Sequence, residues 1–203
     1  MKPKNITLAQ RAYDSIFEML LHKKIKPAET IKRRDIAAHL NMSLAPVAEA
    51  MQRLERDGFL ITKPRSGTTV VGVDETSVRN ICVLRVAIEA QAARMYASKI
   101  SDADFKKLMV LAKKIDSTNS EKINWNAEIS FHSALVELAK CQPLSATFDS
   151  VMKRNLFYSV CSVFPKNRKE SHVKLLNALQ KATADEAEKL VRNHISERIS
   201  LEV

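Results

Sequence analysis

Residues 33–70 read RRDIAAHLNMSLAPVAEAMQRLERDGFLITKPRSGTTV, and this stretch decides the fold of the first third of the chain. Its apolar spacing predicts two helices, near 33–40 and 45–57, joined by a short turn. In that turn Asn41 tolerates a left-handed backbone, and Ser43 is a good N-cap for the second helix. The pattern therefore predicts a helix-turn-helix whose second helix enters a DNA major groove.

The second helix of this pair is amphipathic. Its expected inner face consists of Val47, Ala50, Met51 and Leu54. Its expected outer face consists of Ala45, Ala48, Gln52 and Arg56. Pro46 falls in the first turn, where its missing N–H is tolerated. The outer face is therefore the one that would meet DNA.

A β-hairpin is expected after the second helix, over residues 58–71. Its two short strands flank Arg65-Ser66-Gly67. Lys63 and Arg65 lie near the tip, where a cation suits contact with the DNA backbone or the minor groove. Such a hairpin is the wing of a winged helix. The alternative is a winged helix that contacts only other proteins.

The rest of the chain predicts packed helices. Gly72 is the last glycine, and few prolines interrupt a long segment rich in Ala, Leu, Lys and Glu. Besides a first helix near 8–21, helices are expected near 75–97, 102–117, 124–139, 144–163, 170–181 and 184–200. We therefore expect a mainly α protein, with a winged helix-turn-helix at 1–74 and an all-helical antiparallel bundle at 75–203.

The composition limits which cellular compartment and which classes of binding partner are expected. The most apolar stretch, 81–88, contains Arg85 and is far shorter than the roughly 20 residues of a membrane span. The N-terminus lacks the pattern of a signal peptide. The three cysteines are widely spaced, which fits a reducing compartment, so we expect a cytoplasmic protein without a membrane partner. The net charge of +10 favours a polyanion such as nucleic acid.

Two histidines of the second domain are related by a helical hairpin. Thr183-x-x-Glu186 is a capping box that marks the start of the last helix. His172 precedes Thr183 by eleven residues and His194 follows it by eleven. An antiparallel hairpin that turns near Thr183 would therefore place both histidines at the same depth, and both lie on apolar faces.

A third histidine lies one helical turn from a carboxylate in the sequence. His132 follows Glu128 by four residues, so the two share a helix face. A lone histidine on an apolar face is usually a satisfied core residue. Three nitrogens and one oxygen in one arrangement instead favour a transition metal. The candidate ligands are Glu128, His132, His172 and His194.

Residues 8–71 resemble the winged helix of GntR-type bacterial regulators. The matches are Asp35-Ile36-Ala37, Ser43, Pro46-Val47, Glu49-Ala50, Leu54-Glu55, Gly58-Phe59-Leu60 and Pro64-Arg65-x-Gly67. The resemblance implies a regulator that binds a double-stranded DNA operator, and Arg34 matches an arginine that the family uses on DNA. Further candidates for DNA contact are Arg33, Ser43, Gln52, Arg65 and Gly67.

Two positions depart from the family. Leu44 and Ala48 stand where it usually has arginines that contact DNA. A good bidentate contact to a base is worth about 1–3 kcal/mol, and Gln52 remains able to pair with adenine. We therefore expect an operator unlike the family's usual one, or weaker affinity.

Residues 76–203 resemble the helical effector domain of the FCD subfamily, which carries Asp-x-x-x-His and two later histidines. The segments EISFH, ESHVKLL and VRNHISE supply these in order, with Glu128 in place of the aspartate. The donor set suits a divalent transition metal such as zinc or nickel, and the resemblance implies that the metal lies beneath a cavity for small carboxylates. Arg85 matches an arginine of the family and would hold the carboxylate effector. The alternative is a plain ion pair with Glu89 at i,i+4 spacing.

The main expectation is a ligand-responsive transcription regulator, not an enzyme. It would act as a homodimer, because palindromic operators mirror a two-fold axis. One alternative is a metal-dependent hydrolase that activates a bound water, although no separate general base stands near the candidate ligands. Another is a scaffold derived from a regulator, with DNA binding weakened at Leu44 and Ala48.

Overall fold

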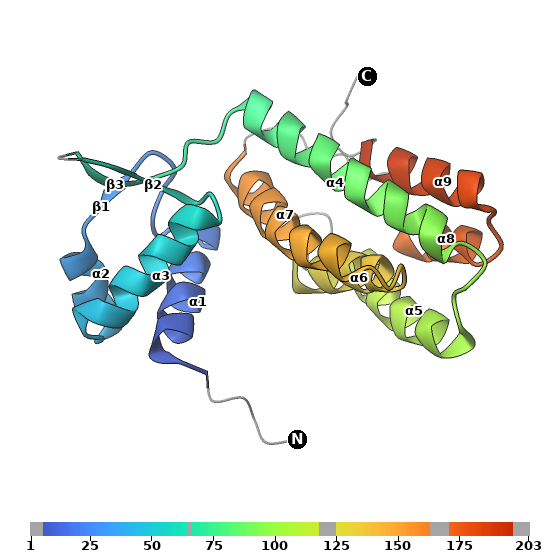
Figure 1. The fold of residues 1–203 in the computed structure, drawn as a ribbon, viewed down its shortest axis with the longest axis horizontal. Coiled ribbons are helices and arrows are strands. Elements are labelled where there is room, and N and C mark those ends of the chain that lie inside the picture. Colours follow the sequence, from blue (N-terminus) through green and yellow to red (C-terminus); the bar gives the residue numbers. More distant parts are fainter. Residues whose placement is uncertain (1–5, 65, 118–124, 163–170, 197–203) are drawn as a thin grey trace. The chain divides into compact units, whose positions relative to one another are not determined.

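The structure is a computed structural model that describes residues 6–64, 66–117, 125–162 and 171–196. The chain divides into two compact units, whose elements are labelled in Figure 1. One comprises Met1–Asp74 and Phe157–Ser162, and the other comprises Glu75–Leu156 and Val163–Val203. In the described ranges, no helix is long and apolar enough to cross a membrane.

The first unit is a winged helix-turn-helix, as predicted. Its elements are α1 (Leu8–Leu21), β1 (Thr30–Ile31), α2 (Arg33–Leu40), α3 (Leu44–Arg56), β2 (Leu60–Lys63) and β3 (Gly67–Val70). The strands form an antiparallel sheet in the order β1-β3-β2, with Thr30 opposite Thr69 and Lys63 opposite Gly67. Strand β1 is absent from the predicted elements, because two residues carry no periodic pattern.

The turn between α2 and α3 has the expected backbone. Asn41 adopts the left-handed conformation, with φ 51° and ψ 44°. Ser43 occupies the N-cap position of α3, but its side chain makes no capping hydrogen bond. The apolar inner face predicted for α3 is buried, and it consists of Val47, Ala50, Met51 and Leu54.

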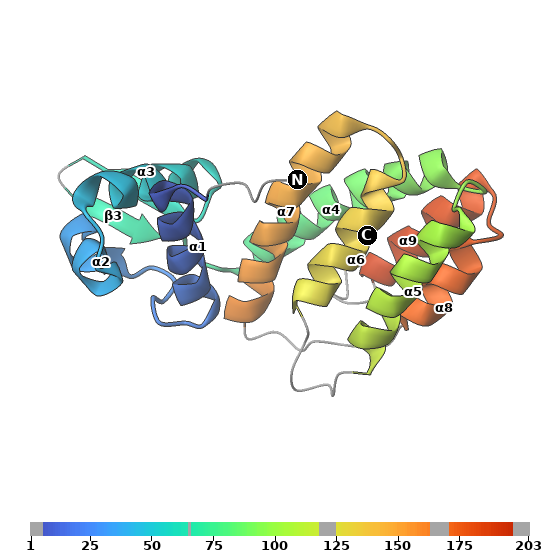
Figure 2. The same cartoon turned by 90° about the horizontal axis from the view of Figure 1, so that it is seen from below.

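Helix α1 packs against α3, and Figure 2 shows the two side by side. Polar contacts fix the pair at its edge. Arg53 on α3 donates from Nη2 to Gln10 Oε1 at 2.9 Å, and its guanidinium lies 4.8 Å from the ring centre of Tyr13. The hydroxyl of Tyr13 donates to Asp57 at 2.6 Å. The Arg53 side chain is therefore already engaged within the unit.

The described elements of the second unit are all helices, and the described residues between them form short turns. Its elements are α4 (Glu75–Tyr96), α5 (Asp102–Asp116), α6 (Trp125–Glu137), α7 (Gln142–Cys161, of which the residues from Phe157 on belong to the first unit), α8 (His172–Leu179) and α9 (Ala184–Ser196). Helix α4 packs against α9 and α6, and α5 packs against α6 and α8. These contacts bring α4, α6, α8 and α9 around one core, which holds the candidate metal ligands.

The α8–α9 hairpin turns where the sequence predicts. The backbone N–H of Thr183 donates to Glu186 Oε2 at 2.8 Å, and the Glu186 N–H donates back to Thr183 Oγ1 at 3.4 Å. This reciprocal pair is a capping box at the start of α9. Helices α8 and α9 therefore pack as the antiparallel pair that the histidine spacing requires.

Candidate metal centre and DNA-binding surface

Three histidines from three helices converge in the core of the second unit. His132 lies on α6, His172 begins α8 and His194 lies on α9, and each is at most 1% exposed. Each offers one ring nitrogen, and the three nitrogens lie within 4.8 Å of one another. The capped hairpin of α8 and α9 produces the closest ring pair, with the centres of His172 and His194 4.8 Å apart.

Glu128 lies beside this triad at the distance expected of a fourth ligand. Its Oε2 atom is 3.6 Å from His132 Nε2 and 3.4 Å from His172 Nε2. Both distances exceed the usual 2.7–3.2 Å of an N–H···O hydrogen bond. Two ligands of one tetrahedral ion with bonds of about 2.1 Å are separated by about 3.4 Å. The donor types therefore fit a divalent transition metal, and Glu128 Oε2 lies at about this separation from two of the three imidazoles.

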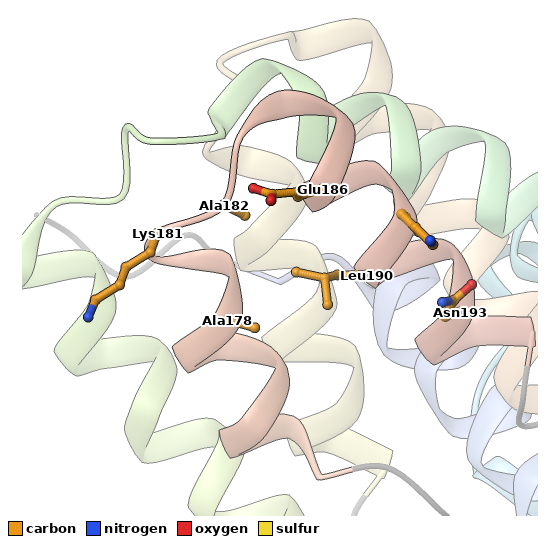
Figure 3. Close-up of a pocket in the computed structure, with 7 residues that line it drawn as sticks. Ala178, Lys181, Ala182, Glu186, Leu190 and Asn193 are labelled. Atoms are coloured by element: carbon orange, nitrogen blue, oxygen red, sulfur yellow. The ribbon is translucent and has the colours of Figure 1, made fainter.

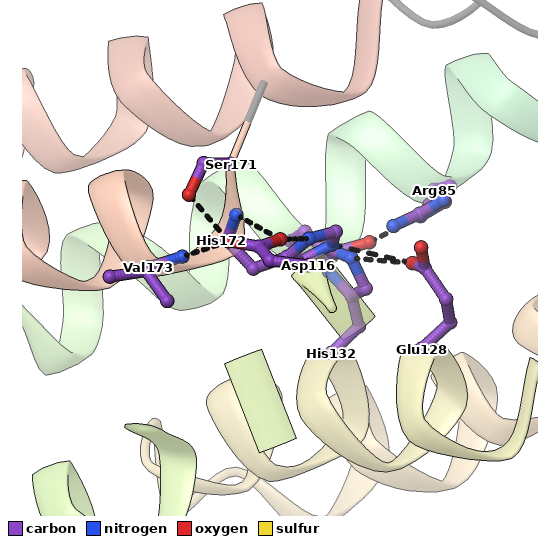
Figure 4. Close-up of polar contacts among 8 residues, drawn as sticks. Arg85, Asp116, Glu128, His132, Ser171, His172 and Val173 are labelled. Carbon is purple, nitrogen blue, oxygen red and sulfur yellow. Dashed lines mark hydrogen bonds and ion pairs between the residues drawn. The ribbon is translucent and has the colours of Figure 1, made fainter. Parts of the chain in front are cut away.

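Two further carboxylates contact the other side of the imidazole rings. Glu89 Oε2 lies 2.6 Å from His132 Nδ1, and Asp116 Oδ1 lies 3.1 Å from His172 Nδ1. An Nδ1–H that donates to a carboxylate leaves the Nε2 lone pair for a metal. Within the described residues, His132 Nε2 is buried and makes no hydrogen bond. Figure 4 shows the Asp116 and His172 contacts beside Glu128 and His132.

Asp116 is itself held in place at the end of α5. It accepts hydrogen bonds from the backbone N–H groups of His172 at 3.0 Å and Val173 at 3.1 Å, and from the Ser171 hydroxyl. Burial raises the pKa of Asp116, but these hydrogen bonds outweigh burial and lower it. Asp116 therefore stays ionised and fixes the first turn of α8, which carries His172.

Arg85 and Glu89 form a buried ion pair on α4. Arg85 Nε lies 2.5 Å from Glu89 Oε1, and the two side chains are 4% and 3% exposed. Burial raises the pKa of Glu89, but the Arg85 guanidinium and His132 outweigh burial and lower it to about 2. Among the described residues, the buried Nη2 atom of Arg85 has no hydrogen-bond partner. The ion pair considered from the sequence is thus present, and one guanidinium nitrogen remains for another acceptor.

Sequence reasoning missed two carboxylates of this cluster. It considered Glu89 only as a partner of Arg85, and it did not consider Asp116. Glu89 shares the inner face of α4 with Arg85, so its spacing holds a weak signal. Asp116 has no local signal, because it meets His172 across 56 residues of sequence.

The sequence-predicted DNA contacts lie on the surface of the first unit. Arg33 and Arg34 are exposed in the first turn of α2. The other exposed candidates are Ser43, Gln52 and Gly67. Gly67 has a φ of +89°, which only glycine adopts without strain. Arg65 lies outside the described residues.

The wing is fastened to α3 by one carboxylate. Glu55 accepts hydrogen bonds from the backbone N–H of Thr62 at 2.8 Å and from its hydroxyl at 3.0 Å. The Thr62 and Thr68 hydroxyls lie 3.0 Å apart, which joins β2 to β3. Glu55 therefore fixes the position of the wing relative to the helix expected to enter the major groove.

A surface pocket of about 440 Å³ lies along α8, α9 and the turn between them, as Figure 3 shows. Its lining consists of Ala178, Lys181, Ala182, Glu186, Lys189, Leu190 and Asn193. None of the three histidines contributes to that lining. The pocket is therefore distinct from the histidine cluster.

Comparison with protein families matches both units. Residues 8–70 match the family described as bacterial regulatory proteins, gntR family, and residues 80–197 match the FCD domain. The HTH-type transcriptional repressor RspR of Escherichia coli is 26% identical, with 93% of this chain and 86% of that protein covered. The uncharacterized HTH-type transcriptional regulator YdhC of Bacillus subtilis is 24% identical, with 91% and 86% covered.

Solved structures with the same fold span nearly the whole chain. Escherichia coli McbR/YncC superposes with a TM-score of 0.75 at 17% identity, covering 97% of each chain. A putative GntR transcriptional regulator from Rhodococcus sp. RHA1 superposes with a TM-score of 0.70 at 18% identity, covering 95% of each chain. At these identities, the likeness shows the fold.

Proposed function

The chain belongs to the GntR family of bacterial transcription regulators and carries an FCD domain, and we propose that it holds a divalent metal and senses a small carboxylate. In this proposal residues 1–74 bind DNA, and residues 75–203 bind the metal and effector and form the dimer. The family and the relatives point to a DNA-binding regulator and away from the metal-dependent hydrolase considered from the sequence.

The proposed metal ligands are Glu128, His132, His172 and His194. The observation that carries this proposal is the position of Glu128 Oε2, at 3.4 and 3.6 Å from two imidazole Nε2 atoms. Three nitrogens and one carboxylate oxygen suit zinc or nickel better than a hard ion such as Mg²⁺. The bound ion would supply a positive charge that attracts an anionic effector. Glu89 and Asp116 would orient the two histidines that donate to them.

The proposed effector contact is Arg85. Its guanidinium is buried in the same core as the histidines, and its Nη2 atom has no partner among the described residues. A guanidinium fork suits a carboxylate, and burial strengthens the attraction. The ion pair with Glu89 uses Nε, so the Nη2 atom of Arg85 can donate to a second carboxylate while the ion pair with Glu89 stays intact.

The active form is proposed to be a homodimer on a palindromic operator. Each winged helix would read one half-site. The exposed apolar side chains Val83 and Leu84 on α4, 54% and 39% exposed, support contact with a second copy. Effector binding would shift the population between two arrangements of the winged helices, which requires different effector affinities in the two states. Such a protein would act in the cytoplasm, where the bacterial chromosome lies.

Metal analysis of the full chain, purified without an affinity tag, tests the central claim. The protein is analysed for metal directly, and again after dialysis against zinc or nickel followed by metal-free buffer. We expect one equivalent of ion per chain in the second sample. Failure to retain stoichiometric metal would mean that the four residues form only a buried polar cluster.

A further inference from the structure

The exposed surface of α3 begins with an apolar patch. Leu44, the first residue of the helix, is 49% exposed, and its neighbour Ala45 is exposed as well. Ala48, one turn later, is partly exposed. A large apolar side chain left half in water forgoes the free energy of burial, which favours a partner that covers it. We define the apolar patch of α3 as Leu44, Ala45 and Ala48.

The first two turns of α3, which carry this patch, contain no cation. All residues of the helix are described, and the cations among them are Arg53 and Arg56. Arg53 is held by Gln10 and by the ring of Tyr13. Arg56 ends the helix, two turns beyond Ala48. The first two turns of α3 therefore offer no guanidinium to a guanine.

The polar side chains of the same surface prefer other base edges. Gln52 is exposed, and its amide can both donate to N7 and accept from N6 of adenine. Glu49 is also exposed, and an ionised carboxylate accepts only from amino groups, which adenine and cytosine carry. Guanine presents two acceptors in the major groove, so neither the carboxylate nor the apolar patch suits it. The carboxylate can accept from the cytosine of a G·C pair, so the preference for A·T pairs rests on the apolar patch and Gln52.

Thymine supplies the complementary group. Its C5-methyl is the apolar feature of the major groove, and small or branched apolar side chains contact it. On the basis of the proposed function, we propose that α3 reads A·T base pairs, with Leu44, Ala45 and Ala48 against thymine methyl groups and Gln52 on adenine. Phosphate contacts come instead from α2, where Arg33 and Arg34 are exposed. Affinity and sequence preference thus arise from different helices.

Replacing thymine by deoxyuridine tests the inference, because it removes only the methyl group. The full chain first selects duplexes from a random pool, and the enriched thymines are then replaced one at a time. Losing one buried methyl corresponds to about a fourfold weaker Kd at about 0.8 kcal/mol per group. We expect that loss at two or more thymines of each half-site. Leu44→Ala should weaken binding to the duplex that contains thymine. At one thymine, replacement by deoxyuridine should then no longer reduce the affinity of this variant.

Val110→Ala provides the matched control. Val110 is 68% exposed on α5, in the other unit, so its truncation should leave the Kd and every deoxyuridine effect unchanged. Selected sites dominated by guanine, or binding indifferent to deoxyuridine, would overturn the inference and leave DNA binding standing. Failure of the full chain to retain any duplex at low salt would contradict DNA binding itself.

Discussion

At the scale of single residues, Glu89 joins two parts of the core that lie far apart in the sequence. One of its oxygens pairs with Arg85 at 2.5 Å, and the other lies 2.6 Å from His132 Nδ1. A change at the guanidinium therefore reaches the imidazole through one carboxylate. In this regulator, the connection would link the residue proposed to hold the effector to a residue proposed to hold the metal.

Glu89 and Asp116, the outer carboxylates, contact the Nδ1 atoms of His132 and His172, and removing either carboxylate should weaken metal binding. We expect Glu89→Gln and Asp116→Asn each to lower metal affinity about 10–100-fold, because such partners fix the tautomer and orientation of ligating histidines. Competition with a chelating dye measures the affinity, and the visible spectrum of the cobalt-loaded protein should change. Glu137→Gln, an exposed neighbour on α6, is the control. Unchanged affinity in both outer variants would mean that the carboxylates serve only the fold.

His194 should account for most of the stabilisation that a metal provides. An ion that binds only the folded state raises its stability with the ratio of free ion to Kd. His194→Ala removes the ligand contributed by α9, so zinc or nickel should raise the Tm of this variant far less than that of the parent. His22→Ala is the control, because His22 is exposed on the other unit beside Glu18. An equal rise in the Tm of both variants would contradict the ligand set.

Arg85 should separate effector response from DNA binding. Arg85→Met would leave Glu89 as a buried, half-paired charge, at a cost of about 3–5 kcal/mol of unfolding free energy. Arg85→Lys keeps the charge but lacks the planar fork. We expect the lysine variant to bind DNA normally and to respond weakly to a panel of small carboxylates in a gel-shift titration. A normal response would favour the plain ion pair.

At the scale of elements, the α8–α9 hairpin determines how closely His172 and His194 approach. The Thr183 cap fixes where α9 begins, and with it the register of the pair. Thr183→Ala should lower the free energy of unfolding by about 1 kcal/mol, the usual cost of losing such a cap. Urea denaturation measures this. Ser130→Ala, exposed inside α6, should change stability by less than about 0.5 kcal/mol.

The elements also show which parts of the site could be predicted from the sequence. Helical periodicity and a capping box are local signals, so helix α9 was predictable. The same signals predicted that His194 on α9 and His172 on α8 lie at equal depth in the hairpin. Strand β1 was not predictable, because Thr30 and Ile31 become a strand only by pairing with β3. Asp116 was missed for the same reason, since its partner His172 is distant in sequence.

At the scale of the whole molecule, the net charge of +10 governs the approach to DNA. Cations that neutralise phosphates release condensed counterions, so log Kobs should fall linearly with log salt, by about 0.9 per phosphate contacted. Because α3 offers no free cation in its first two turns, the slope should depend on α2 and the wing.

Arg34→Ala should make that slope less negative by about one and weaken binding at low salt, without changing which duplexes are selected, because a phosphate contact carries no sequence information. Fluorescence anisotropy on one selected duplex at several salt concentrations measures both effects. Lys107→Ala removes an equal charge from an exposed position of α5 in the other unit, so it should leave the slope unchanged. If both variants shift the slope equally, the dependence reflects net charge and not contacts of the winged helix. If neither shifts it, Arg34 does not touch the DNA backbone.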